Sequence, residues 1–511
     1  MPQPDTERFR LRRFMETLVQ NGECVIHDAP IDMVDVAAVL DGNFKAVWFK
    51  KVGPEGAELV GNVMGSRRRL AQSLGETEAE FPAALRRRFS EPVAPVEVSS
   101  KNAPVQQVIL KGDDADLTRL PVHLQHEMDG APYISASIDF SRDPATGFTN
   151  LGCRRMMLRG PKSAGIDLNA PSDLRMIYQA AVAKGDRLPV AFTVGNHPAD
   201  FLAGVASTAP IDEFHVMGAI RGAPVPIVKC VSIDVFVPAD AEFVLEGYLD
   251  NTGLSEPEGP YGEYLGYYGE VKRNPVFHLT AITHRKDAIF QTVTIGGRYL
   301  GRTDTAQLVA AKTEATIWDS LRQAIRQPVA VCSTPSCGGM YNVRVSMRQR
   351  YPGEARNAIA AVFGSLGDVK HVFVVDEDID VFSDEQIDWA LATRFQADRD
   401  FVVASGFRAV PIDPSLVGSR IGAKGGFDCT KPFGQARGLG YSLPEPPRMP
   451  EAAQASVEER LNTGPATFLE LMAATKTRDG RELLRTFDEL YKAGRLGRKE
   501  DGRYILTGGT Q

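Results

Sequence analysis

The chain has 511 residues, of which 43% are hydrophobic and 24% charged, and its formal net charge is -7 at pH 7. This length exceeds what one hydrophobic core supports, so several packed units are expected, and the composition excludes a disordered or fibrous protein. The negative charge gives no reason to expect nucleic acid or an anionic membrane as the main partner.

Targeting and membrane signals are not evident in the sequence. The N-terminus is charged from residue 5 onward and lacks the apolar segment of a signal peptide. No window approaches the roughly 18 apolar residues of a membrane span, so a cytoplasmic protein is expected. Six scattered cysteines argue against a disulfide framework, and the close pair Cys332 and Cys337 stands without the further ligands of a zinc site.

Hydrophobic spacing predicts an N-terminal α/β unit over residues 1–105. Apolar residues at helical spacing between residues 8 and 20 predict one helix, and a glycine turn before "SRRRLAQSLG" predicts a second, shorter helix. The Pro/Val-rich passage that follows reads as a connector, because proline disfavours helix.

From residue 106 to 310 the pattern changes to short β-rich runs such as "YISASIDFS" and "LPVAFTVG", each bounded by Gly, Pro, Asp or Asn. Such runs predict a sheet or a barrel. A helix interrupts them at residues 172–184, where Ser172 supplies an N-cap. Residues 311–445 alternate helices with strands, so a third unit of α/β type is expected.

Residues 451–511 follow a Pro-rich linker and form a separate tail. Leu483, Leu484, Phe487, Leu490 and Tyr491 recur at helical spacing, and a hairpin is expected around residues 501–502. A helix followed by a β-wing is the outline of a winged helix, which invites a DNA-binding interpretation. The tail carries ten basic and ten acidic residues, and phosphate binding requires a basic surface. An interaction or oligomerisation role is therefore favoured.

The stretch "EPEGPYGEYLGYYG" places Glu258 and Glu263 five residues apart around a Gly-Pro-Tyr-Gly turn. Its glycines let the backbone approach a planar ligand closely. Two carboxylates in one pocket shift each other's pKa, so a cation can hold one ionised while the other donates a proton. The candidate cations are Arg154 and Arg155 in "TNLGCRRMMLRG". Taken alone, residues of these types are most often surface charges, and a Gly-Pro-Tyr-Gly turn only marks a tight bend.

The segment "VPIVKCVSIDVFVPADAEFVLEGYLDNTGLSEPEGPYGEYLGYYGEV" resembles the signature region of the UbiD family, reversible decarboxylases that use prenylated FMN. "GNVMGSRRRLA", "RLPVAFTVGNHPADFLAGVAS" and "SRIGAKGGFDCTKP" resemble further family segments in the same order. With the tail, the resemblance implies an α+β fold: an N-terminal α/β unit, a central split β-barrel that binds flavin, a C-terminal α/β oligomerisation domain and a small winged-helix-like tail.

The resemblance also implies catalytic residues. The family pattern "EGPxG[ED]" matches Glu258 and Glu263, and the family spacing from a metal-ligand asparagine, here Asn150, selects Arg155 over Arg154. The implied reaction is the reversible, non-oxidative decarboxylation of an aromatic, heteroaromatic or α,β-unsaturated acid through a covalent adduct with the flavin. Arg155, paired with Glu258, would hold the substrate carboxylate, and Glu263 would donate the proton.

Metal and cofactor contacts are implied in the same way. Asn150 and Glu213 match ligands of a divalent metal, Mn or Mg, and "ASTAP" at residues 206–210 matches a loop that holds K or Na near the flavin phosphate. The implied cofactor contacts are Asn150, Arg155, Ala206, Ser207, Ala209, Pro210 and Glu213, with Lys424 as a further candidate.

One family position does not transfer to this chain. The metal-ligand histidine of the family falls on Pro171, which has no metal-binding side chain. Either Asn169 or Asp173 takes its place, or the metal sphere is remodelled. His197 and His215 are alternatives by residue type, but they lie outside the family position and are expected to be structural.

An aromatic or heteroaromatic monocarboxylic acid is the favoured substrate, because the four tyrosines in residues 261–268 offer planar packing surfaces. Arg298 or Arg302 could meet a second acidic group, although a surface role is favoured slightly. The resemblance implies a flavin prenyltransferase as supplier of the cofactor and a homo-oligomer, either a dimer or a hexamer. Two alternatives stay open: an ordinary FMN-dependent reductase, and a ligand-sensing regulator that uses the C-terminal tail.

Overall fold

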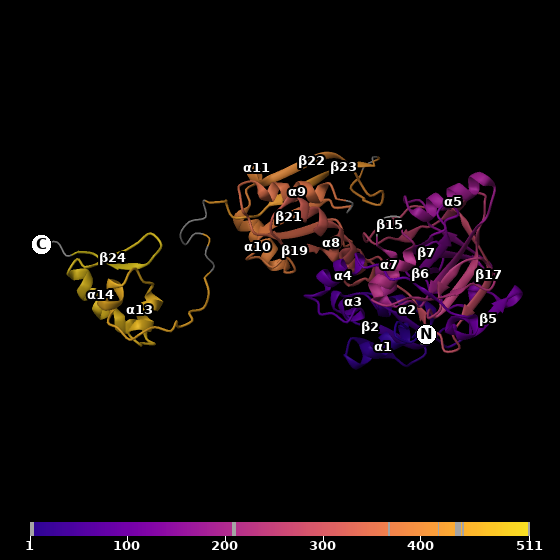
Figure 1. The fold of residues 1–511 in the computed structure, drawn as a ribbon, viewed down its shortest axis with the longest axis horizontal. Helices are drawn as coiled ribbons and strands as arrows, with labels where there is room; N and C mark the ends of the chain where they lie inside the picture. The colour runs from indigo at the N-terminus through magenta and orange to yellow at the C-terminus, as the bar shows by residue number, and fades with distance from the viewer. Residues whose placement is uncertain are drawn as a thin grey trace. The chain divides into compact units, whose positions relative to one another are not determined.

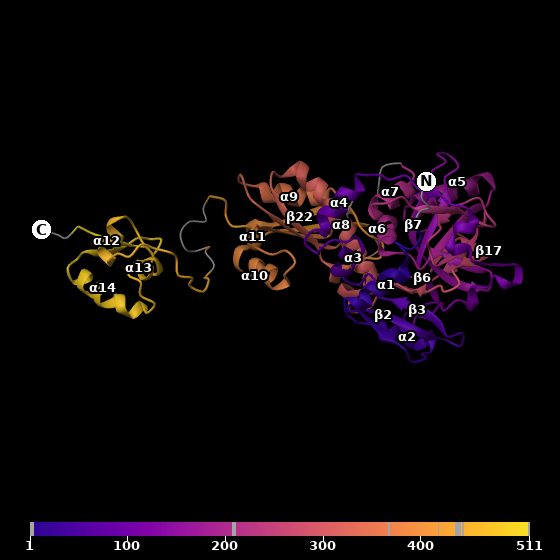
Figure 2. The ribbon, with the colours of Figure 1, turned by 60° about the horizontal axis from the view of Figure 1, so that its bottom comes forward.

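The computed structural model describes residues 5–206, 211–365, 368–416, 418, 420–434, 441 and 444–508. The chain divides into two compact units, residues 1–429 and 430–511 (Figures 1 and 2). The predicted α+β class is confirmed, because mixed sheets and helices make up the first unit. In the described residues, every helix is too short or too polar to cross a membrane.

The N-terminal region is built on a four-stranded sheet in the order β1-β2-β3-β18. Strand β18 comes from much later in the chain and pairs in parallel with β3, which ties this region to the barrel. The predicted helix near residues 8–20 is present as α1, and its apolar side is buried. The elements are α1 (Leu11–Gln20), β1 (Cys24–His27), α2 (Met33–Leu40), β2 (Ala46–Val52), β3 (Ala57–Gly61), α3 (Arg67–Ser73), α4 (Phe81–Phe89) and β18 (Phe290–Gln291).

Six antiparallel strands close into a barrel in the order β12-β9-β6-β7-β8-β17, because β17 also pairs with β12. Strand β5 pairs with residues 281–284 of β17, on the edge whose first part pairs with β8. Closure leaves few unpaired backbone groups, and it confirms the barrel prediction. The strands are β5 (Val108–Lys111), β6 (Tyr133–Arg142), β7 (Thr149–Gly160), β8 (Ser163–Ile166), β9 (Leu188–Val194), β12 (Phe243–Leu249) and β17 (Val276–His284).

Helices and hairpins surround the barrel. The predicted helix at 172–184 is present as α5, where Ser172 Oγ accepts from Arg175 N–H at the start and Gly185 ends the helix at φ 77°. The remaining elements are β4 (Val96–Glu97), α5 (Asp173–Lys184), α6 (Pro198–Gly204), α7 (Glu213–Arg221), β10 (Pro226–Lys229), β11 (Phe236–Pro238), β13 (Glu256–Glu258), β14 (Tyr261–Gly262), β15 (Tyr268–Gly269) and β16 (Lys272–Asn274).

The C-terminal region of the first unit is α/β, as predicted. Its five-stranded sheet has the order β19-β20-β21-β23-β22, with parallel pairing from β20 to β23 and antiparallel edges. Helices α8 and α9 pack on one apolar cluster, and α10 on another. The elements are α8 (Asp304–Ala324), β19 (Pro328–Ser333), β20 (Asn342–Met347), α9 (Glu354–Phe363), β21 (His371–Asp376), α10 (Asp384–Arg394), α11 (Ala397–Asp400), β22 (Phe401–Arg408) and β23 (Ile421–Asp428).

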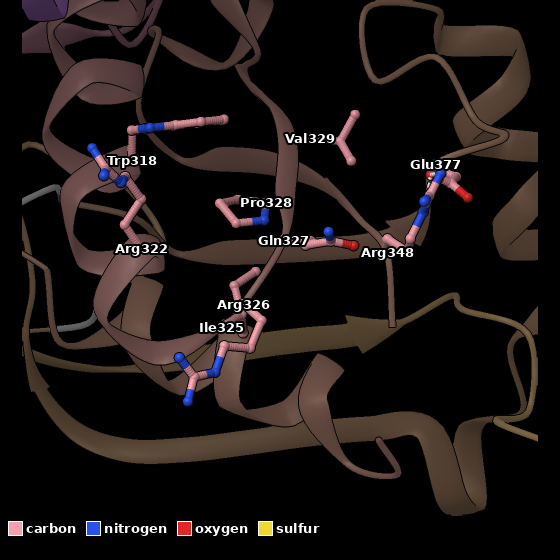
Figure 3. Close-up of a pocket in the computed structure, with 9 residues that line it drawn as sticks. All are labelled: Trp318, Arg322, Ile325, Arg326, Gln327, Pro328, Val329, Arg348 and Glu377. Carbon is pink, nitrogen blue, oxygen red and sulfur yellow. Dashed lines mark hydrogen bonds and ion pairs between the residues drawn. The ribbon is translucent and has the colours of Figure 1, made fainter. Parts of the chain in front are cut away.

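A surface cleft of about 670 Å³ lies where α8 ends and β19 begins (Figure 3). Arg348 Nε donates to Glu377 Oε2 at 2.6 Å on one of its walls. The lining residues are Trp318, Arg322, Ile325, Arg326, Gln327, Pro328, Val329, Arg348 and Glu377, and the predicted site residues are not among them.

The second unit has its own apolar core and the outline of a winged helix. Three helices precede a two-stranded antiparallel hairpin. Leu483, Phe487 and Leu490 of the predicted helix are buried, whereas Leu484 and Tyr491 are exposed. The five apolar residues span more of the helix surface than the one face that packs on the core. The elements are α12 (Val457–Asn462), α13 (Phe468–Ala474), α14 (Leu483–Lys492), β24 (Leu496–Arg498) and β25 (Tyr504–Leu506).

A buried ionic network joins α6 and α7 to the chain before β12. Arg221 donates to both oxygens of Asp200, at 2.6 and 2.8 Å, and to both oxygens of Asp240, at 2.7 and 3.2 Å. All three side chains are buried. Because a buried carboxylate is costly without its cation, this network is sensitive to the loss of one member.

We therefore expect Arg221→Ala to lower the free energy of unfolding of the first unit by about 3–5 kcal/mol, since two buried carboxylates lose their partner. Urea denaturation followed by tryptophan fluorescence measures this change, because Trp48, Trp318 and Trp389 all lie in the first unit. Arg119→Ala, which removes an exposed arginine, is the control and should leave the urea midpoint unchanged. Equal midpoints for both variants would contradict the prediction.

Candidate active site

Arg154 and Arg155 leave opposite faces of β7, because side chains alternate along a strand. Arg154 Nε lies 3.0 Å from Asp139 Oδ1, and its Nη2 donates to Ser172 Oγ at 3.2 Å. Arg155 turns toward the hairpin formed by β13 and β16. The two neighbouring arginines therefore belong to two different polar clusters.

The three predicted catalytic side chains meet in one ion-pair cluster. Arg155 Nε and Nη2 donate to the two oxygens of Glu258 at 3.1 and 3.3 Å, and Arg155 Nη1 donates to Glu263 Oε1 at 2.9 Å. Glu258 is fully buried and also accepts from Asn274 Nδ2 at 3.1 Å. Burial disfavours the charged guanidinium, but Glu263 and Glu258 raise the pKa of Arg155 well above its usual value.

Two further charged residues complete this cluster and were not predicted from the sequence. Asp167 Oδ2 lies 2.9 Å from Arg155 Nη2, and Lys272 Nζ lies 3.8 Å from that oxygen and 3.7 Å from Glu263 Oε1. Burial opposes ionisation of Asp167, yet the charges of Arg155 and Lys272 lower its pKa. Strand pairing brings Lys272 to the cluster, because Lys272 on β16 is the register partner of Glu258 on β13. Only that register would have identified Lys272.

Residues 126–129 fix the backbone in front of Glu263. Gly262 N–H donates to Asp129 Oδ1 at 2.9 Å, and Asp129 Oδ2 accepts from His126 N–H at 3.0 Å and lies 3.2 Å from His126 Nδ1. The His126 ring lies directly against Gly262, where a β-carbon would come within 2.4 Å of Nδ1. Position 262 therefore has room only for glycine.

Of the tyrosines in residues 261–268, Tyr261 lines the cluster. The Arg155 guanidinium lies 4.5 Å from the centre of the Tyr261 ring, and that ring packs against Tyr133 at 4.2 Å. Tyr261 is fully buried, whereas Tyr267 and Tyr268 are exposed. Fewer of the four tyrosines therefore line the cluster than the sequence suggested.

The predicted metal ligands lie on the Arg154 side of β7. Glu213 Oε2 accepts from Leu151 N–H at 2.5 Å, directly after Asn150, whose Nδ2 donates to Asp139 Oδ2 at 3.3 Å. Burial raises the pKa of Glu213 to about 7, and the charges of Asp139, Asp173 and Asp212 add to this. Burial likewise raises the pKa of Asp139 to about 6. The donor set is rich in oxygen and negative charge, which fits a hard divalent cation.

The two replacements considered for Pro171 lie in different places. Asn169 Nδ2 donates to Asn274 Oδ1 at 2.8 Å, so this amide belongs to the surroundings of Glu258. Asp173 is close enough to Glu213 to raise its pKa. Among the residues that the structure describes, no three His, Cys, Asp or Glu side chains are arranged to hold a metal.

The two histidines do not join the predicted metal ligands. His197 is buried, its Nδ1 accepts from Ala199 N–H at 3.2 Å, and its ring packs against Phe9 and Phe14. Burial lowers the pKa of His197 to about 3. His215 Nδ1 lies 3.9 Å from Asp212 Oδ1. The contacts of His197 fit the structural role that was expected of it, and the role of His215 stays a prediction.

The remaining predicted contacts are only partly described. Ala206 N–H donates to Ala203 O at 3.0 Å, while Ser207, Ala209 and Pro210 lie outside the described residues. Lys424 Nζ donates to Phe363 O at 3.0 Å and lines a pocket of about 450 Å³ in the C-terminal region. Burial lowers the pKa of Lys424.

The two arginines considered for a second acidic group differ in their surroundings. Arg302 Nη1 donates to Gly42 O at 2.6 Å, and its guanidinium lies 3.3 Å from the centre of the Phe44 ring. Through these contacts, Arg302 packs against the N-terminal region. Arg298 is exposed.

Three family models match the chain: the N-terminal domain of 3-octaprenyl-4-hydroxybenzoate carboxy-lyase over residues 15–89, its Rift-related domain over 96–299 and its C-terminal domain over 306–429. The chain belongs to the UbiD family. It is therefore a member of a family of carboxy-lyases, and the resemblance drawn from the sequence is confirmed.

Relatives match over most of the chain. Anhydromevalonate phosphate decarboxylase from Methanosarcina mazei is 32% identical over 422 residues, which are 82% of this chain and 96% of the relative. The UbiD-class enzyme HmfF from Pelotomaculum thermopropionicum, solved with FMN, has a TM-score of 0.81 at 32% identity and covers 86% of this chain and 97% of its own. The 3,4-dihydroxybenzoic acid decarboxylase of Enterobacter cloacae has a TM-score of 0.78 at 26% identity, with coverages of 87% and 98%.

We expect Gly262→Ala to disrupt the turn that carries Glu263, because the new methyl group would force the His126 ring away from Asp129. Overpacking of this kind costs about 1–3 kcal/mol of unfolding free energy, and thermal unfolding measures the loss. Gly160→Ala is the matched control, since a β-carbon there meets no atom within 4 Å. A melting temperature equal to that of the wild type in Gly262→Ala would show that the ring yields without cost.

Proposed function

We propose that this chain is a prenylated-FMN-dependent decarboxylase of an aromatic, heteroaromatic or α,β-unsaturated carboxylic acid. The observation that carries the proposal is the buried cluster in which Arg155 contacts both Glu258 and Glu263. Ordinary flavin redox chemistry has no need of an arginine between two acids. The FMN and prenylated-FMN complexes of HmfF support a flavin at this fold.

Each member of the cluster has a distinct role in this proposal. When bound, prenylated FMN supplies an electrophilic carbon that takes up the electron pair released as CO2 departs. Arg155 orients the substrate carboxylate through paired N–H donors. Glu258 accepts hydrogen bonds from Arg155 and Asn274 and so fixes the orientation of the guanidinium. Glu263, which is the less enclosed acid, donates the proton that replaces CO2.

The second polar cluster would hold the phosphate end of the cofactor. Asn150 and Glu213 would bind Mn or Mg, with Asp173 in place of the histidine that the family has at position 171. The loop at 206–210 would hold K or Na, and Lys424 would contact the cofactor phosphate. A flavin prenyltransferase would supply the cofactor, and a homo-oligomer is proposed because HmfF has an evolved dimeric form.

The experiment that tests the proposal is co-expression of the full chain with a flavin prenyltransferase. The absorbance and mass of the bound cofactor are recorded, and a panel of unsaturated, aromatic and phosphorylated acids is screened for CO2 release. We expect release only from protein that carries the prenylated flavin. CO2 release by protein loaded with unmodified FMN, or by protein without flavin, would overturn the assignment.

Two substitutions test the proposed roles. We expect Glu263→Gln to lower the decarboxylation rate by about 100-fold to 10,000-fold while the flavin stays bound, because the proton donor is lost. Arg155→Ala should lower the rate more than Arg154→Ala, since Arg154 contacts Asp139 and Ser172 instead of the two glutamates. Turnover numbers and flavin content of the three variants are the measurements. Equal losses for the two arginine variants would contradict the assignment of Arg155.

A further inference from the structure

Asp167 occupies the position on Arg155 that a substrate carboxylate needs. A guanidinium has five N–H groups. Arg155 directs one from Nε and one from Nη2 to Glu258, one from Nη1 to Glu263, and its Nη2 also lies 2.9 Å from Asp167 Oδ2. The contact of Nη2 with Asp167 is an ion pair, unlike the hydrogen bonds that Arg155 donates to the two glutamates. A substrate carboxylate that pairs with Nη1 and Nη2 would meet the like-charged Asp167 there, so paired binding requires Asp167 to move.

Asp167 is the acid that can leave most easily. Its side chain is 20% exposed, compared with 0% for Glu258 and 7% for Glu263. Glu258 has a second donor in Asn274, which holds it in place. Asp167 Oδ1 accepts from Asn169 N–H at 3.0 Å, while Oδ2, the oxygen that contacts Arg155, has a second cation in Lys272 Nζ at 3.8 Å. Moving to Lys272 would keep the Asp167 charge compensated.

The charge of the cluster adds a second constraint. Two cations, Arg155 and Lys272, face three carboxylates, Glu258, Glu263 and Asp167, so the formal sum is -1. A bound substrate carboxylate would bring it to -2 in a largely buried site, where charges of like sign repel strongly. One added proton removes this excess. Glu263 is the acid that the proposed reaction needs in its protonated form.

We propose that Asp167 and Lys272 are positioning residues that exchange with the substrate: a carboxylate displaces Asp167 from Arg155 onto Lys272, and its binding takes up one proton from solvent onto Glu263. The inference rests on the proposed function. Under this proposal, substrate binding delivers to Glu263 the proton that decarboxylation later consumes.

The other groups around Glu263 do not supply that proton. Burial raises the pKa values of Tyr133, Tyr261 and Tyr264, so these phenols stay neutral at neutral pH. Asp129 is engaged with His126 and with the Gly262 N–H. The charged and titratable groups that face Glu263 or its turn are Arg155, Lys272, Asp167, Glu258, Asp129, His126, Asp368, Tyr133, Tyr261 and Tyr264.

Isothermal titration of the full chain loaded with unmodified FMN tests this inference, because that cofactor leaves the acid intact. The probes are benzoate, 3,4-dihydroxybenzoate and crotonate, each titrated in buffers of different ionisation enthalpy between pH 6.5 and 8.5. We expect binding with uptake of about one proton, so that the Kd rises about tenfold per pH unit where the free site is ionised.

Two variants test the roles of Asp167 and Lys272 separately. Asp167→Asn removes one negative charge, so we expect binding about tenfold tighter at pH 8, with little proton uptake. Lys272→Gln should weaken binding about tenfold. Arg273→Gln is the matched control, since the same charge is lost one position along β16, on a residue that is exposed; its Kd should equal that of the wild type.

Several outcomes would overturn the inference. They are the absence of binding by all three probes, binding without proton uptake, and an Asp167→Asn variant whose Kd and proton uptake equal those of the wild type. Circular dichroism spectra verify that each variant is folded. The two experiments can fail separately. If no acid releases CO2 but the probes bind with proton uptake, the decarboxylase proposal is rejected, and the exchange of Asp167 between Arg155 and Lys272 is still supported.

Discussion

The carboxylate of Glu258 is fully buried, and this one constraint organises the surroundings of the ion-pair cluster. A buried carboxylate keeps its charge only when a cation and further donors compensate for lost hydration. Arg155 from β7 and Asn274 from β16 provide that compensation. The barrel must therefore present β7 to the β13-β16 hairpin in a fixed register, and any shift of the hairpin would leave Glu258 without its partners.

Strand β7 separates two polar clusters by nothing more than the alternation of its side chains. Arg155 faces the two glutamates, while Asn150 and Arg154 contact Asp139 on the other face. A rigid strand holds both sets at once, so the proposed metal end and the proposed reactive end of one cofactor can be positioned by a single element. A loop in its place would not keep that separation.

Local signals in the sequence were sufficient for much of the fold. The capped start of α5 at Ser172 and the buried stripe of α1 follow from neighbouring residues alone. Glu258, Glu263 and Arg155 were identified because their motifs resemble a known family. Asp167 and Lys272 could not be found in this way, because only the pairing of β7 with β8 and of β13 with β16 brings them to the cluster. Long-range register is the information that one sequence lacks.

The two clusters differ in charge balance, and that difference favours the proposed metal site over the Arg155 cluster as the place for an added cation. The Arg155 cluster pairs three acids with two cations, so its deficit is small enough for one proton to remove. On the other face, burial and the charges of Asp139, Asp173 and Asp212 raise the pKa of Glu213 to about 7, and Arg154 forms an ion pair with Asp139. Protons could neutralise these acids too, but protonated carboxyl groups are poor metal ligands. A divalent ion would keep Glu213 ionised while the glutamates across the strand remain free for proton transfer.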